Sequence, residues 1–116
     1  DQARGARVHH NTVVSNDAAT GFFSSIDYRF GNTDVTIRNN VVRRITNRNG
    51  ASGTVDTNLE DADFSLFEDA PSGDVHLLGS ASDAIDQGVE VPEAGVDIDG
   101  ETRDEGPPDL GADERR

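Results

Sequence analysis

Alternating apolar and polar residues recur twice in the N-terminal half of the chain. Residues 6–16 read ARVHHNTVVSN and residues 35–45 read VTIRNNVVRRI, an offset of 29 positions. In this alignment Val8 falls on Ile37, and Val13 falls on Val42. A period of two is typical of β-strands, and no window carries the 3.6-residue apolar stripe of an amphipathic helix. The pattern therefore predicts an all-β fold with two short strands in each repeat.

An asparagine stands between the two short strands of each repeat, at Asn11 and at Asn40. Asparagine tolerates the left-handed backbone conformation that turns a strand sharply. Its side-chain amide can also hydrogen-bond to the same amide in a stacked repeat. We therefore predict that Asn11 and Asn40 form a ladder at the bend.

A third apolar segment and a turn lie between the two repeats. Residues 21–30 read GFFSSIDYRF, in which Phe23, Ile26 and Tyr28 predict a strand, and GNTD after them predicts a turn. Two strands, a bend, a return strand and a turn make one coil of a solenoid. A repeat of about 20 to 50 residues with strands in every unit indicates a solenoid. Coils stacked at the usual spacing of about 4.8 Å would form a parallel β-helix, here of about three coils.

Four segments, in this order, resemble the C-terminal part of bacterial right-handed parallel β-helix proteins of the pectin lyase-like superfamily: IDYRFGNTDVTIRNNVV, NGASGTVDTN, DVHLLGSASDAIDQG and DIDGETRDEGPPDLGADE. The resemblance implies right-handed coils over residues 1–88 and an acidic capping tail over residues 89–116. It also implies carbohydrate contact and an extracellular or cell-surface location. The superfamily includes lyases, hydrolases, epimerases, adhesins and non-catalytic proteins, so the fold does not select an activity.

The chain is strongly acidic, with a formal net charge of −13. Residues 59–116 hold eighteen Asp and Glu against three Arg, and such a surface repels phosphate backbones, so we expect no nucleic-acid partner. Cysteine is absent, which excludes disulfides and thiolate metal sites. No apolar run approaches the roughly 20 residues of a membrane span. Because the chain has no Met, we expect it to be part of a longer protein, whose upstream coils, or a second molecule, would cover the N-terminal end.

Candidate substrate contacts are His9 and Arg38, which share a column in the repeat alignment. Both should point outward, because Val8 and Ile37 should point inward. The resemblance implies that outward columns on this strand hold acidic sugars in the enzymes of the superfamily, and His76 would extend the column. The alternative is that all three are ordinary solvated side chains. A lyase also needs a base with cationic neutralisation in one groove, so we assign no catalytic residue.

The C-terminal stretch VDIDGETRDEGPPDLGADERR allows two interpretations. Asp97, Asp99 and Gly100 match part of a calcium loop, but the later ligands of that motif are missing. We therefore assign no metal or other cofactor, and keep calcium at Asp97 and Asp99 as the lesser alternative.

The better interpretation is a capping tail, because apolar residues alternate with carboxylates in this stretch. We predict that Ile98 and Leu110 pack on the open end or the flank of the coils. Arg103 should bridge to Asp97, Asp109 or Glu114. Such a tail would protect core residues and strand edges from pairing with another chain.

Together these patterns predict a non-catalytic structural or carbohydrate-associated β-helix segment that closes the C-terminal end of a solenoid. One alternative is part of a polysaccharide lyase or related enzyme acting on acidic polysaccharide. A second alternative is a self-stacking subunit of an extracellular fibre or surface array.

Overall fold

The computed structural model describes residues 3–15 and 24–116, and this part of the chain is mostly β. Its helices, η1 (Phe64–Leu66), η2 (Ala70–Ser72) and η3 (Pro92–Ala94), are single 3-10 turns, and none has the length or apolarity to cross a membrane. The strands are β1 (Arg7–His9), β2 (Thr12–Val13), β3 (Ile26–Arg29), β4 (Val35–Arg38), β5 (Val41–Val42), β6 (Ile45–Arg48), β7 (Gly53–Asp56), β8 (Phe67–Asp69) and β9 (Asp74–Leu77).

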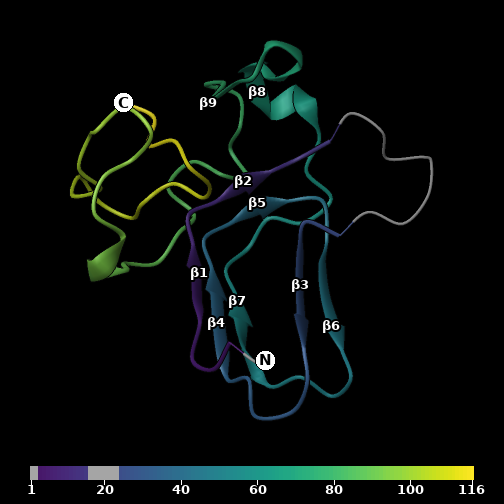
Figure 1. The fold of residues 1–116 in the computed structure, drawn as a ribbon. Helices are drawn as coiled ribbons and strands as arrows, with labels where there is room; N and C mark the ends of the chain where they lie inside the picture. The colour runs from purple at the N-terminus through teal and green to yellow at the C-terminus, as the bar shows by residue number, and fades with distance from the viewer. Residues whose placement is uncertain (1–2, 16–23) are drawn as a thin grey trace.

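Three short parallel sheets, β1-β4-β7, β2-β5 and β3-β6, form the N-terminal part of the fold (Figure 1). We call β1–β3 the first level, β4–β6 the second level, and β7 with Leu59 the third level. Val8 pairs with Ile37 and Val13 with Val42, which is the register that the sequence repeat predicts. Ile37 and Val42 are fully buried, because like side chains stack on one another from level to level.

The levels differ in length. β2 and β3 are separated by residues 14–25, whereas β5 and β6 are separated only by Arg43 and Arg44. This difference explains why the repeat offset is 29 residues between the first two levels, although Val35 pairs with Gly53 at an offset of 18. The predicted strand in residues 21–30 is present as β3, and Phe23 lies outside the described residues.

The bend between the two short strands is left-handed, but not at the predicted residue. The positive φ angles fall on His10 (53°), Asn39 (57°) and Thr57 (55°), one position before each ladder asparagine. The preceding residue therefore makes the turn. The side-chain amide of the asparagine that follows can then hydrogen-bond to the next level.

Parallel pairing ends at the Val41–Leu59 bridge, short of the predicted coil boundary at residue 88. Beyond Leu59 the chain turns through η1 and forms β8 and β9, which pair antiparallel. Phe67 of β8 and Leu77 of β9 are buried in one apolar cluster with Val41 and Leu110. These strands thus pack as a hairpin beside the parallel sheets and do not form another level.

The tail lies against the flank of the parallel sheets, at the corner beside β1 and β2 (Figure 1). Gly111 N donates to Asn39 O (2.7 Å), and Ala112 N donates to Thr12 Oγ1 (3.0 Å). All four residues of β7 are exposed, and Val55 keeps 38% of its surface accessible. The tail therefore covers the corner and leaves the β7 edge open, so the predicted closure of that end does not occur in this part of the chain.

Candidate functional site

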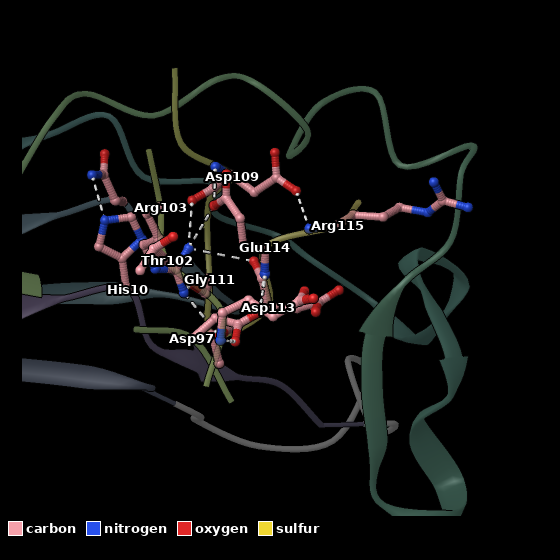
Figure 2. Close-up of polar contacts among 12 residues, drawn as sticks. His10, Asp97, Thr102, Arg103, Asp109, Gly111, Asp113, Glu114 and Arg115 are labelled. Atoms are coloured by element: carbon pink, nitrogen blue, oxygen red, sulfur yellow. Dashed lines mark hydrogen bonds and ion pairs between the residues drawn. The ribbon is translucent and has the colours of Figure 1, made fainter. Parts of the chain in front are cut away.

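A buried arginine lies at the centre of the tail. The Arg103 side chain is 5% exposed, and its Nη1 contacts Glu114 Oε2 at 2.9 Å. Nη2 donates to Ala112 O (2.9 Å) and Gly111 O (3.2 Å), and Figure 2 shows these bonds converging on the guanidinium. Of the three predicted partners of Arg103, its ion pair selects Glu114. The Arg103 guanidinium thus binds both the Glu114 carboxylate and the backbone carbonyls of Gly111 and Ala112.

Asp97 is a second fixed point, because its carboxylate accepts three backbone N–H groups. Oδ1 accepts from Asp99 N and Glu101 N (both 2.9 Å), and Oδ2 accepts from Glu114 N (3.0 Å). Burial opposes ionisation, but the hydrogen bonds from these N–H groups outweigh it and lower the pKa of Asp97. Asp97 therefore joins residues 97–101 to the end of the tail.

Asp109 and Glu114 complete this network. The Asp109 carboxylate accepts from Asp86 N (2.7 Å) and Arg115 N (2.8 Å), and Glu114 Oε2 also accepts from Asp109 N (2.9 Å). Burial raises the pKa of Glu114, so the ionised form relies on Arg103. These carboxylates are used to satisfy buried backbone donors, which is a structural role.

The two apolar residues predicted to pack under the tail behave differently. Leu110 is 4% exposed and lies in the apolar cluster, as expected. Ile98 is 48% exposed and Val96 is 54% exposed, so the prediction for Ile98 is wrong. Residues 96–102 form a turn organised around the buried Asp97, with a single Val96–Thr102 bridge, and period-two alternation has no meaning outside a strand.

The tail contacts the left-handed bends between β1 and β2 and between β4 and β5, at His10 and Asn39. Asn39 Nδ2 donates to Val89 O (2.7 Å) and to His10 Nε2 (3.0 Å), which assigns the ring proton of neutral His10 to Nδ1. Burial, assisted by the nearby Arg103, lowers the pKa of His10 to about 4. His10 is therefore a neutral contact between the corner and the tail.

The column that contains His9 and Arg38 continues to Asp56 of β7. Arg38 forms a two-pronged ion pair with Asp56, with Nε–Oδ1 at 2.7 Å and Nη2–Oδ2 at 3.2 Å. His9 and Arg38 line a hollow with Glu90 and Glu93, and burial lowers the pKa of His9. Carboxylates thus offset the cations here, which disfavours an acidic sugar.

His76 does not extend this column, because β9 pairs antiparallel with β8 and lies outside the sheet of β1 and β4. His76 Nδ1 contacts Asp74 Oδ1 at 2.5 Å, and Nε2 contacts Asp99 Oδ2 at 3.0 Å. The hydrogen bond to Asp74, followed by that to Asp99, raises the pKa of His76 to about 9. The imidazolium therefore links the hairpin to the tail.

His76, Asp99 and Asp113 are the described residues that could hold a metal ion, with one ligand atom of each within 4.8 Å of the others. At neutral pH an ion would have to displace the proton of His76, whose pKa is about 9. Asp113 Oδ2 already accepts from Leu77 N (2.7 Å). The predicted calcium pair is not assembled, because Asp97 binds backbone N–H groups and Asp99 faces His76.

Sequence reasoning missed Asn58, His10 and Asn39 as elements of this corner. A signal was present, because VDTNL at residues 55–59 repeats the spacing of IRNNV at residues 37–41.

Comparisons with protein-family models, with curated proteins and with solved structures each found no match to this chain. The function must therefore be argued from the geometry of the chain itself.

Proposed function

We propose that this chain is a non-catalytic structural segment of a right-handed parallel β-helix from an extracellular protein. In this proposal the three levels are successive coils, and the tail locks their flank. The stacking of Val8, Ile37 and Val55 in one register supports the proposal. The asparagine ladder supports it too, because aligned amides recur at the same corner of each level.

The observation that carries the proposal is the use made of the buried charges. Arg103, Asp97 and Asp109 contact backbone groups of the tail and fix its shape. The tail so shaped bonds to the sheets through Gly111 N and Ala112 N, which donate to Asn39 O and Thr12 Oγ1. A catalytic site instead directs its charged groups at a place that a substrate can occupy. Among the described residues Arg103 Nε has no hydrogen-bond partner, but the other contacts of these buried charges are made within the fold, which favours a structural role.

Deletion of residues 96–116 tests the structural role. The truncated chain should lose the contacts to Asn39 and Thr12 and expose Leu77, which lowers the melting temperature and increases binding of an apolar dye. The matched control removes only Arg116, which is at the exposed C-terminus. Equal melting temperatures for the full and the truncated chain would contradict the proposal.

A polysaccharide-lyase assay tests the alternative directly. The protein is incubated with uronic-acid polymers, and the appearance of unsaturated ends is followed by ultraviolet absorbance. We expect no product, because Arg38 is paired with Asp56 and Glu93 faces the same hollow as His9. Product that disappears in both His9→Ala and Arg38→Ala would replace the structural proposal by an enzymatic one.

A further inference from the structure

The asparagine ladder has a direction. Asn40 Oδ1 accepts from Asn11 N (2.9 Å) and Asn11 Nδ2 (3.0 Å). Asn58 Oδ1 accepts in the same way from Asn40 N (3.1 Å) and Asn40 Nδ2 (2.9 Å). Each amide oxygen thus receives two hydrogen bonds from the level before it.

A second hydrogen bond runs the other way in each step. Asn40 Nδ2 donates to Val8 O, and Asn58 Nδ2 donates to Ile37 O, both at 2.9 Å. The acceptor in each case is the carbonyl three residues before the ladder asparagine of the preceding level. The step between levels is therefore one repeated motif with fixed donors and acceptors.

The two ends of the ladder are complementary. Among the described residues, no donor reaches Asn11 Oδ1, and no acceptor receives Asn58 N–H. The first level consequently offers an unused acceptor, and the third level offers an unused donor. A further copy of the step motif would join Asn58 of one molecule to Asn11 of the next.

Apolar surface is exposed at both ends as well. A hollow at the first-level end is lined by Val8, Ile26, Tyr28 and Phe30, and Phe30 is 42% exposed. At the other end, Val55 of β7 is 38% exposed although its register partner Ile37 is fully buried. β1 and β7 are the two edge strands of one sheet, and edge strands template pairing with another chain.

We infer that the molecules stack head to tail, with β7 of one molecule pairing in parallel with β1 of the next. This inference rests on the proposed β-helix. The register follows from the existing pairs: Val55 lies over Val8 of the second molecule, as it lies over Ile37 within its own chain. The interface is heterologous, so association continues beyond a dimer.

The charge of the molecule predicts a salt dependence for stacking. In this register Asp56 would lie next to His9 of the second molecule, so no two carboxylates would face each other at that position. The net charge of −13 opposes association as a whole, and salt screens this long-range repulsion. Stacking should therefore strengthen between about 0.05 and 1 M salt.

Analytical ultracentrifugation of single-end variants tests the inference. Val55→Asp places a carboxylate at the β7 end, and Phe30→Asp places one at the β1 end, where Asp tolerates the positive φ of 73°. Ile98→Asp is the matched control, since Ile98 is at least as exposed as Val55 and Phe30 but belongs to the tail. If Val55→Asp does not fold by circular dichroism, Thr54→Lys on the same exposed strand replaces it.

The wild type and Ile98→Asp should sediment as species that grow with protein concentration and with salt. Each end variant alone should reach dimers at least tenfold less readily. An equimolar mixture of the two should stop at a dimer, because each molecule retains one intact end. A wild type that stays monomeric at high concentration and salt, or end variants that self-associate like the control, would overturn the inference. A folded monomer without lyase activity would leave the structural proposal in place.

Discussion

Replacing Arg103 by Ala should remove a large part of the free energy of unfolding of this protein. The change removes the 2.9 Å ion pair with Glu114 and the hydrogen bonds to Gly111 O and Ala112 O. The Glu114 side chain is 10% exposed, so its carboxylate would remain buried without a cation. Removal of one partner of a buried pair costs about 3–5 kcal/mol, against a total of about 5–15 kcal/mol for an ordinary domain.

Urea unfolding followed by circular dichroism measures this loss as a shift of the midpoint at constant slope. Arg116→Ala is the control, because Arg116 pairs with Glu101 (3.4 Å) and Glu105 (3.1 Å) at the surface, where its side chain is 33% exposed. The control should cost less than about 1 kcal/mol. A cost below about 1 kcal/mol for Arg103→Ala would refute the argument that this arginine holds the tail.

A double-mutant cycle separates the ion pair from the rest of the network. Glu114→Gln keeps an oxygen that can accept from Asp109 N, at 2.9 Å in the native chain, but removes the charge that faces Arg103. The coupling between Arg103→Ala and Glu114→Gln should exceed about 1 kcal/mol, because the two side chains share one contact. Additive costs would mean that Arg103 acts mainly through the backbone carbonyls.

Three further outcomes can be measured by the same unfolding assay. Asn40→Ala should cost at least about 2 kcal/mol more than Asn11→Ala, because Asn40 is fully buried and bonded to both neighbouring levels. The pKa of His76 is raised to about 9, so its contribution should be complete below about pH 6.5, vanish as the pH rises through 9, and be absent in His76→Asn. Gly111→Ala should cost about 1–3 kcal/mol more than Gly100→Ala, because a Cβ at Gly111 would lie 2.6 Å from Thr12 Oγ1, whereas Gly100 has open space. Equal costs within either pair, or a pH profile unchanged by His76→Asn, would contradict these expectations.

The sequence predicted the register of the first two levels because the repeat is explicit in it. Val8 and Ile37 share a column whose chemistry is the same in both copies, and the pairing follows. About three coils were predicted, but the third level was not aligned with the first two, because Gly53 takes the place of a buried apolar residue there and its offset is shorter. A Cβ at Gly53 would lie 2.5 Å from Val35 O, so close backbone approach explains the glycine that hid the repeat.

The site was less accessible from sequence because it depends on contacts between distant segments. Packing of the tail on the end or the flank of the sheets was predicted, and the Arg103–Glu114 pair was among its predicted bridges. The burial of Asp97 in place of Ile98 could not be read from alternation, because backbone N–H groups from three separate positions fix that carboxylate. His76 was misplaced for a similar reason, since only tertiary packing brings it to Asp99.

The position of the tail on the flank has a consequence for the order of stability along the levels. The tail donates hydrogen bonds to Thr12 in the first level and to Asn39 in the second, and none of those described reaches β7. The third level is therefore held by its pairing with β4 and by the Asn58 contacts, with Val55 exposed on its other side. Local stability follows the density of buried contacts, so β7 is the level that gains most from a second molecule. The tail on the flank thus contacts the first two levels and leaves the β7 edge available for pairing.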